Sequence, residues 1–382
     1  MNSASLPVVL LTCGDPAGIG PEVVVKAWAS TPAHDRARLR VVADAAVLAR
    51  SLVGRAGLPA LPIDVVAPDD PRGSHGGRLL VIEPAGLWPG DAPGGGGASP
   101  PVDAVPIRAG VATAAGGAAA AAAVLAAAHL VRTGRARGIV TGPLHKAALQ
   151  AAGFDVPGHT ELLARDCGLD DDAVSMMLWL PTATGPGGLG VVHVTLHEPL
   201  ARAVTRITTS GIVEAGGRLA GLLAPLVGRP PRIAVAALNP HAGESGLFGD
   251  EEERIVAPAV RRLVAAGIDA TGPLPADTLF LRAAAGGFDG VVALYHDQGH
   301  IPVKLLGMHR AVNITLGLPL VRTSVAHGTA FDIVGTGAAD PASMLAAIDA
   351  AERLVAAGWP AATDTGHAQL DRRDAIPGAQ LP

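Results

Sequence analysis

The chain has 382 residues, a formal net charge of −5 and 16% charged residues, so no basic excess points to nucleic acid or to an anionic membrane surface. A single hydrophobic core stops growing at roughly 250 to 300 residues, and we therefore expect two domains. The two cysteines, Cys13 and Cys167, are too few for a disulfide framework or a cysteine metal site and fit a reducing cytoplasm. A small-molecule ligand is favoured, with neither nucleic acid nor a membrane as partner.

The N-terminal region reads as a buried strand that turns tightly into a helix. The apolar run PVVLLT (residues 7–12) is followed by CGDPAGIGPE (13–22), in which glycines permit a close turn and Pro21 with Glu22 can open a helix. The segment lacks the spacing of a phosphate loop and of a GxGxxG fingerprint, so a dinucleotide-binding Rossmann unit is not indicated. A ligand-binding loop and a plain strand-to-helix turn both remain open here. The N-terminus also lacks the basic region of a signal peptide.

Two segments between the first strands and the middle of the chain have unusual composition. Residues 87–106 are rich in Gly and Pro, which predicts a surface loop without regular structure, as does the C-terminal stretch 367–382. Residues 109–131 carry no formal charge and consist mostly of Ala and Gly. Because such residues transfer weakly into lipid, a closely packed buried helix is preferred over a membrane span.

Short apolar runs alternate with helix-length segments along the rest of the chain, which is the pattern of an α/β protein. The runs that we expect to form buried strands are PVVLLT (7–12), LRVVAD (39–44), RGIVTG (137–142), LGVVHVTL (189–196), RIAVAAL (232–238) and GVVALY (290–295). Residues 252–267 and 341–358 have the apolar spacing of helices.

Polar motifs follow several of these strands, where ligands of α/β proteins usually bind. TGPLHK (141–146) and PGHTELL (157–163) come first. His159 and Thr160 offer hydrogen-bonding groups where Glu161 and Leu162 are expected to begin a helix, an arrangement suited to an anion. A simple helix cap is the alternative reading of this pair.

Histidines recur after three later strands. VVHVTLHEPL contains His193 and His197, LNPHAGESGLFGDEEE contains His241, and YHDQGHIPVK contains His296 and His300. Strand alternation places His193 inside the sheet and lets His197 emerge at the loop. Neutral imidazole is a common metal ligand, and three ligands with an open position make a catalytic site.

Taken in order, these motifs resemble the 4-hydroxythreonine-4-phosphate dehydrogenase family of pyridoxal phosphate biosynthesis. The resemblance rests on GDPAGIGPE, TGPLHK, PGHTELL, HEPL, LNPHAGESGLFGDEE, GPLPADTLF, YHDQGHIPVK and VNITLGLPLVRTSVAHGTAFDIVGTG, and it spans about residues 7 to 355. It implies an α/β fold of the isocitrate and isopropylmalate dehydrogenase type, with two domains and the active site in the cleft between them. We place the first domain at residues 1–138 and 305–382, with the nucleotide-binding loop in its C-terminal part. The second, with the metal ligands and the dimer contact, is placed at 139–304.

The resemblance also implies roles for particular residues. The implied metal ligands are His197, His241 and His296. The implied substrate-binding residues are His159, Thr160, Lys304, Asn313 and Arg322. Lys304 and Asp277 are the catalytic candidates, although Asp277 receives no definite step, and the general base is not assigned. His145, His193 and His300 are left out of the predicted site.

The run HGTAFDIVGTGAADP (327–341) is similar to the loop that holds the adenosine part of NAD in isopropylmalate-type dehydrogenases. The resemblance therefore implies NAD or NADP as cofactor, bound through His327, Gly328, Asp332 and Gly335. A glycine-rich turn before the next helix is the alternative for this run.

The implied chemistry is the oxidation of 4-hydroxythreonine 4-phosphate followed by decarboxylation to 3-amino-2-oxopropyl phosphate. One divalent metal per site (zinc, magnesium or cobalt) would stabilise negative charge on the reacting oxygen. The family acts as a homodimer, in which equivalents of His197 and His241 come from one subunit and that of His296 from the other.

Other activities remain open at this point. Some members of the family act on the 4-phosphates of D-erythronate and D-threonate, and some relatives oxidise an aromatic cis-dihydrodiol. PGHTE and the set Lys304, Asn313 and Arg322 favour a phosphorylated four-carbon hydroxy acid over the diol. A metal-dependent hydrolase of a phosphorylated metabolite and a catalytically silent binding protein are alternatives of other classes, and the HGTAFDIVG run argues against both.

Overall fold

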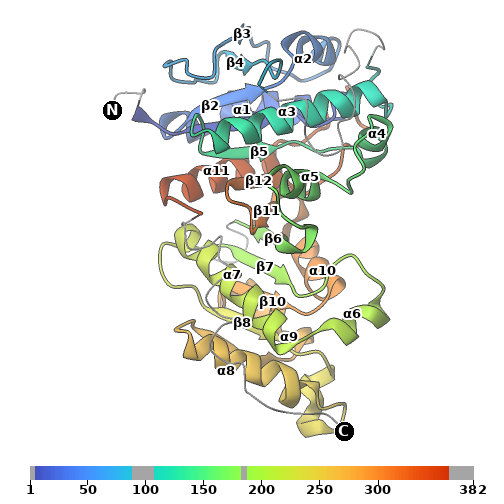
Figure 1. Cartoon of the computed structure of the whole chain (residues 1–382), viewed down its shortest axis with the longest axis vertical. Helices are drawn as coiled ribbons and strands as arrows, with labels where there is room; N and C mark the ends of the chain where they lie inside the picture. The colour runs from blue at the N-terminus through green and yellow to red at the C-terminus, as the bar shows by residue number, and fades with distance from the viewer. Residues whose placement is uncertain (1–4, 88–106, 182–186, 361–382) are drawn as a thin grey trace.

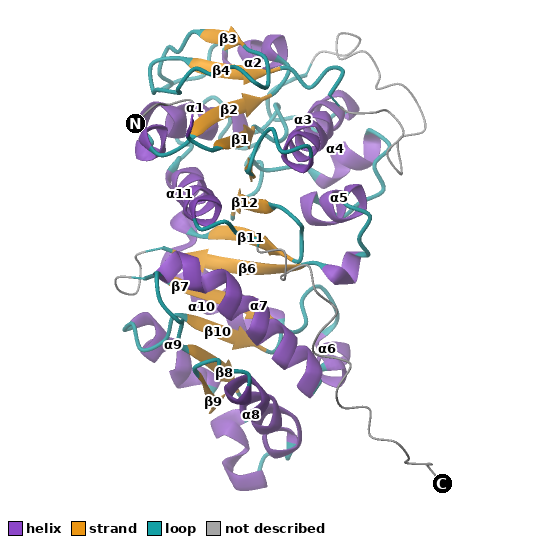
Figure 2. Ribbon diagram, turned by 60° about the vertical axis from the view of Figure 1, so that its left-hand side comes forward, coloured by secondary structure: helices purple, strands orange, loops and turns teal. Residues whose placement is uncertain are grey.

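The computed structural model describes residues 5–87, 107–181 and 187–360. One 12-stranded sheet runs along the long axis of the molecule in the order β3-β4-β2-β1-β5-β12-β11-β6-β7-β10-β8-β9, as Figures 1 and 2 show. The strands are β1 (Val8–Thr12), β2 (Arg38–Val42), β3 (Ile63–Val65), β4 (Leu79–Ile82), β5 (Gly138–Thr141), β6 (Ser175–Leu180), β7 (Leu189–His193), β8 (Ile233–Ala236), β9 (Ala270–Leu274), β10 (Gly290–Ala293), β11 (Val312–Leu316) and β12 (Val321–Val325). The predicted α/β class is confirmed.

Helices cover both faces of the sheet (Figure 2). They are α1 (Gly20–Ser30), α2 (Ala45–Leu52), α3 (Ala114–Arg132), α4 (Lys146–Ala151), α5 (His159–Asp166), α6 (Leu200–Arg206), α7 (Thr209–Val227), α8 (Ala257–Ala265), α9 (Ala276–Ala284), α10 (His296–Gly307) and α11 (Ala342–Ala356). The α7 helix packs on β7, β10 and β8, and α10 packs on β10, β7 and β6. The α7 and α10 helices lie on opposite faces of the sheet. A Cβ added at Gly190 of β7 would meet α7, whereas Gly299 of α10 lies against Val191, the next residue of β7. Successive residues of a strand point to opposite faces.

All six apolar runs predicted as strands form strands, and each is buried because helices cover both faces. The sequence analysis missed the other six strands of the sheet, which are β3, β4, β6, β9, β11 and β12. Of these, β6 and β11 pair antiparallel with their neighbours in the middle of the sheet. Three antiparallel steps, from β12 to β7, reverse the direction of the second half of the sheet. As a result, β12 begins at the edge where β7, β10 and β8 end.

The apolar segment with small residues forms α3, a helix long and apolar enough to cross a membrane by length and composition alone. Inside the protein, 72% of its apolar stretch is buried, which confirms the prediction of a core helix. Gly117 shows why small residues are needed, because a Cβ at this position would collide with the backbone of Ala148 in α4. Residues 88–106 and 367–382, where the sequence predicted loops, lie outside the described residues.

Candidate active site

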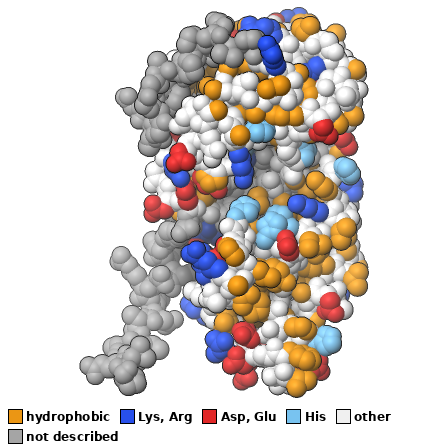
Figure 3. Space-filling model, turned by 90° about the vertical axis from the view of Figure 1, so that its right-hand side faces the viewer, with side chains coloured by type: hydrophobic (Ala, Val, Ile, Leu, Met, Phe, Trp, Pro, Cys, Tyr) orange, Lys and Arg blue, Asp and Glu red, His pale blue; other side chains and the backbone are white. Residues whose placement is uncertain are grey.

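Two of the predicted metal ligands lie side by side at the carboxyl ends of neighbouring parallel strands. His197 follows β7, and His296 is the first residue of α10, directly after β10. Their ring centroids are 5.9 Å apart. His193, the last residue of β7, is buried as predicted, with 5% of its surface exposed. Figure 3 shows histidines gathered midway along one face of the molecule, with basic side chains beside them.

Burial and neighbouring groups favour the neutral form of His193, His197 and His300. Burial lowers the pKa of His197, and the neighbouring His296 and Lys146 lower it further. Burial and His296 likewise lower the pKa of His300 to about 4, and the pKa of His193 lies well below the ordinary value for the same reasons. Because a metal binds the neutral ring, the lowered pKa of His197 leaves this residue in the form that ligates at neutral pH.

One ring nitrogen of His296 is already engaged. Its Nδ1 lies 2.6 Å from a carboxylate oxygen of Asp297, and since a carboxylate only accepts hydrogen bonds, Nδ1 carries the proton. In the neutral ring, Nε2 then presents its lone pair to a ligand. Carboxylate–histidine pairs of this type hold the ring and its tautomer in many metal sites.

His241 lies on a separate turn after β8. Residues 241–245 all have positive φ, and the carboxylate of Glu252 holds the start of the turn by accepting hydrogen bonds from the backbone nitrogens of Leu238 and Asn239 at 2.8 and 2.7 Å. The side chain of His241 is 64% exposed, and its Nδ1 is 3.3 Å from a carboxylate oxygen of Glu244. Within the part of the chain that the structure describes, no three His, Cys, Asp or Glu side chains are arranged so that they could hold a metal ion.

Arg322 is a buried cation in the middle of the sheet. Its side chain lies on β12 with 3% of its surface exposed, and its guanidinium donates to the hydroxyl of Thr141 at 2.8 and 3.2 Å and to that of Thr315 at 2.9 Å. Burial lowers the pKa of Arg322 to about 10, although the negative charge of Glu161 opposes the shift. No carboxylate of the described residues forms an ion pair with it, so the arrangement is suited to an anionic ligand.

Two other predicted substrate residues have buried polar atoms without partners. Nε2 of His159 and Oδ1 of Asn313 are both buried and form no hydrogen bond within the described protein. Burial, reinforced by the charge of Arg322, lowers the pKa of His159 well below its usual value. The α5 helix begins at His159, two residues earlier than predicted, and Thr160 follows in its first turn. Buried unpaired atoms of this type mark places where a ligand completes the hydrogen bonding.

The two catalytic candidates lie on different helices and are exposed. Lys304 is on α10, four and eight residues after His300 and His296, so the three share one face of the helix. The α10 helix runs continuously from His296 to Gly307 through Pro302. Asp277 is in the first turn of α9, a helix that contacts the turn bearing His241.

The predicted nucleotide loop packs against α1. Nδ1 of His327 donates to the carbonyl of Gly328 at 2.9 Å, and its Nε2 is buried without a partner in the described residues. Gly335 has φ +80°, and its backbone nitrogen donates to the carboxylate of Glu22 at 2.8 Å. Asp332 is exposed. The turn at Gly335 thus needs glycine because of its positive φ. Cofactor contacts by His327, Gly328, Asp332 and Gly335 stay a prediction.

Several residues of the site were missed from the sequence. Thr141 and Thr315 support Arg322, Glu161 contributes charge to the pocket, and His193 and His300 bond to each other. Thr141 belongs to TGPLHK, and Glu161 to PGHTELL, so the motifs marked both positions without assigning them a role. Thr315 likewise belongs to the quoted run VNITLGLPLVRTSVAHGTAFDIVGTG, and the pairing of β11 with β12 brings it beside Arg322.

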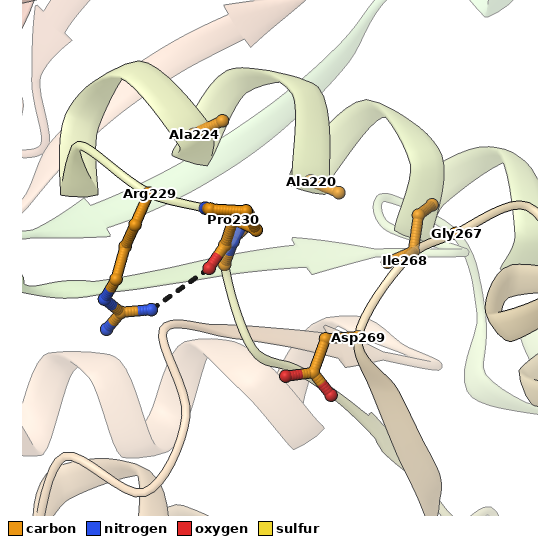
Figure 4. A pocket seen from close by; sticks show the side chains of 8 residues that line it. Ala220, Ala224, Arg229, Pro230, Gly267, Ile268 and Asp269 are labelled. Atoms are coloured by element: carbon orange, nitrogen blue, oxygen red, sulfur yellow. Dashed lines mark hydrogen bonds between the residues drawn. The ribbon is translucent and has the colours of Figure 1, made fainter.

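Two cavities meet at His197. One of about 560 Å³ includes Glu161, His193 and Glu198 in its lining, and one of about 330 Å³ includes Glu198, Tyr295 and His296. A third cavity, of about 390 Å³, lies between the end of α7 and the segments leading into β8 and β9 (Figure 4). Among the described residues that line this cavity, Arg229 is the only Lys or Arg, and it is already paired with Asp289. These residues therefore offer no unpaired positive charge to a substrate anion. The cavities at His197 are the better candidates for the active site.

Comparison with known proteins identifies close relatives. Residues 37–351 match the model of the family described as pyridoxal phosphate biosynthetic protein PdxA. The chain is 44% identical over 350 residues to 4-hydroxythreonine-4-phosphate dehydrogenase of Beijerinckia indica subsp. indica, covering 90% of this chain and 94% of that protein. It is also 44% identical over 352 residues to D-threonate 4-phosphate dehydrogenase of Cupriavidus necator, covering 90% and 96%. The crystal structure of 4-hydroxythreonine-4-phosphate dehydrogenase from Klebsiella pneumoniae superposes with a TM-score of 0.75 at 39% identity, covering 92% of this chain and 98% of that one.

Proposed function

Because this chain belongs to the PdxA family, it is a dehydrogenase, and we propose that it oxidises 4-hydroxythreonine 4-phosphate with NAD or NADP. Decarboxylation of the oxidised acid then yields 3-amino-2-oxopropyl phosphate. Relatives named as dehydrogenases of phosphorylated four-carbon acids support this class of substrate. Membership of a dehydrogenase family also removes the hydrolase and the silent binding protein as alternatives.

The single observation that carries the proposal is the buried guanidinium of Arg322. It is held by two threonine hydroxyls, and no described carboxylate forms an ion pair with it. A buried cation with only neutral partners is costly, and an anionic substrate group would neutralise it. The unpaired Nε2 of His159 and Oδ1 of Asn313 supply further hydrogen-bonding capacity. A phosphorylated hydroxy acid has two anionic groups, and Lys304 is the second cation proposed for them.

We propose His197, His241 and His296 as ligands of one divalent metal, which is zinc, magnesium or cobalt. The neutral ring of His197 fits such an ion, and Asp297 orients the ring of His296. When bound, the metal supplies Lewis-acid stabilisation of negative charge on the substrate. The contribution of the chain is to lower the pKa of His197, which favours its neutral ring, and to hold Nδ1 of His296 with Asp297 so that Nε2 is left for the ion.

A homodimer belongs to the proposal, with His296 completing the site of the partner. Large apolar side chains are exposed on α6, on α10 and directly after α10, and an interface would cover them. They are Leu200 (59% exposed), Val204 (38%), Ile301 (53%), Leu305 (83%) and Met308 (44%). Because α6 follows His197 and α10 begins at His296, a second subunit packed here would lie directly against the metal ligands.

The nucleotide is assigned to the loop that starts at His327. Its position against the GDPAGIGPE segment, through the bond from Gly335 to Glu22, gives that segment a supporting role in cofactor binding. We also propose a cytoplasmic location, which the two unpaired cysteines, Cys13 and Cys167, support.

D-Threonate 4-phosphate is the second candidate substrate, because the enzyme from Cupriavidus necator is as similar to this chain as the relative from Beijerinckia indica. D-Erythronate 4-phosphate belongs to the same class. Comparing kcat/KM for the three phosphates, with NAD and with NADP, tests the choice. The proposal expects the highest value with 4-hydroxythreonine 4-phosphate. A higher value with either sugar-acid phosphate would transfer the assignment to it.

A further inference from the structure

Two histidines outside the predicted ligand set form a buried pair between α10 and the sheet. His193 is 5% exposed and His300 is 6% exposed. Nδ1 of His300 lies 3.1 Å from Nε2 of His193, within hydrogen-bonding distance. Alternation along β7 turns His193 toward the same face as Val191, which α10 covers, so the pair joins the helix to the strand.

The pair contacts the predicted ligand His296 through ring stacking. The rings of His296 and His300 are one helical turn apart on α10, their centroids are 3.9 Å apart, and their planes differ by 10°. Rotation of the His296 ring about its χ2 bond would break this parallel contact. The ring is therefore held on its face by His300 and at Nδ1 by Asp297, which leaves Nε2 free.

The local backbone is fitted to this arrangement. Gly299 lies over β7, and a Cβ at this position would collide with Nε2 of His193 and crowd Val191. Glycine thus lets α10 approach the strand closely enough for His300 to reach His193.

Stability alone does not account for two buried imidazoles. Nδ1 of His193 is buried without a partner in the described protein, and burying an unpaired polar atom costs about 1–3 kcal/mol. Two apolar side chains of similar size would fill the space without this cost. An apolar pair could not form the hydrogen bond between His193 and His300. This bond fixes the His300 ring on the side that faces away from His296.

We propose that His300, held by His193, is a positioning residue that fixes the ring of His296 for metal binding. The inference rests on the proposed function, because it takes His296 as a metal ligand. His300 touches neither metal nor substrate in this account, and it acts by restricting the orientations of the His296 ring before the metal arrives.

The test measures Co²⁺ binding to the full-length protein after chelator treatment, by calorimetry and by the visible spectrum of the bound ion. His300→Ala removes both the stack and the hydrogen bond, His300→Phe keeps a stacking ring, and His300→Gln keeps a hydrogen-bonding group. The expected loss of Co²⁺ affinity is about 10- to 100-fold for His300→Ala, with smaller losses for His300→Phe and His300→Gln. His193→Leu should also weaken binding and alter the Co²⁺ spectrum.

Two controls separate positioning from general damage. His34→Phe changes a partly buried histidine that bonds to Ser74 and to the carbonyl of Trp28 on another part of the molecule, and it should leave Co²⁺ affinity unchanged. His296→Ala gives the background of nonspecific binding.

Affinity and spectrum within twofold of the wild type in both His300→Ala and His300→Gln would overturn the inference while leaving the metal site intact. If His300→Ala does not fold, His300→Gln and His300→Phe decide by the same criterion. Wild-type protein that binds no more Co²⁺ than His296→Ala would instead overturn the proposed metal site, and this inference with it.

Discussion

The hydroxyl of Thr141 on β5 accepts two hydrogen bonds from the guanidinium of Arg322 on β12, at 2.8 and 3.2 Å. The residues are 181 positions apart in the sequence, and the parallel pairing of their strands brings them together. The contact holds a buried cation between neutral groups, and the proposed substrate site is built around it.

Replacing this cation should weaken substrate binding selectively. Arg322→Ala is expected to raise the KM for the phosphorylated acid by about 10- to 100-fold, since a charge-assisted hydrogen bond contributes about 1.5–3 kcal/mol. Lys304→Ala should act in the same direction, and Arg254→Ala, which changes an exposed arginine paired with Asp250, should not. Steady-state kinetics give KM, and calorimetry gives the Kd of NAD. If Arg322→Ala lost NAD affinity and kept the KM for the substrate, Arg322 would belong to the nucleotide site and not to the substrate site.

Metal removal should abolish activity reversibly. Without a Lewis acid, the secondary alcohol of the substrate has far too high a pKa for easy hydride loss. We expect the rate of nicotinamide reduction to fall to background after chelation and dialysis, and to return with zinc, cobalt or magnesium. Full activity in a preparation shown by elemental analysis to be metal-free would contradict this prediction.

Mixing inactive variants tests whether the site is shared between subunits. His197→Ala and His296→Ala should each be inactive, and exchange between them should give heterodimers with one intact site and one doubly defective site. With equal amounts, about half the dimers are mixed, so roughly a quarter of wild-type activity should return. If subunit exchange is demonstrated and no activity returns, His296 acts within its own chain or binds no metal.

The sequence predicted those parts of the molecule that local patterns encode. Buried parallel strands such as β1 and β10 are short continuous apolar runs, and the strand ends located His197 and His296 correctly. Strands such as β3 and β9 are only partly buried and lack a continuous apolar run. The antiparallel direction of β6 and β11 depends on pairing with distant segments. His300 was set aside for a similar reason, since its partner His193 lies 107 positions away.

Asp289 predicts a pH dependence of stability outside the active site. Burial alone would raise the pKa of Asp289, but hydrogen bonds from Arg229 and Arg232 outweigh this effect and hold it well below its usual range. A carboxylate with a lowered folded pKa stabilises the fold above its unfolded pKa, near 4, and the contribution is lost as pH falls toward the folded pKa. Asp289→Asn should cost about 1–2 kcal/mol at neutral pH, a difference that shrinks below about pH 4.

Chemical denaturation at several pH values measures this difference. Asp250→Asn is the matched control, because Asp250 forms an exposed ion pair with Arg254 and should change stability little. Equal effects of the two substitutions at neutral pH would show that the Asp289 cluster contributes no more than a surface pair.

The central claim is that the enzyme oxidises and decarboxylates a phosphorylated four-carbon hydroxy acid. The most direct test supplies wild-type enzyme, a divalent metal and NAD or NADP with 4-hydroxythreonine 4-phosphate, and measures reduced nicotinamide by absorbance together with released carbon dioxide. The account predicts that both products form in equal amounts, and that the unphosphorylated acid gives a much lower rate. Absence of reduced nicotinamide with this substrate and with both sugar-acid phosphates would contradict it.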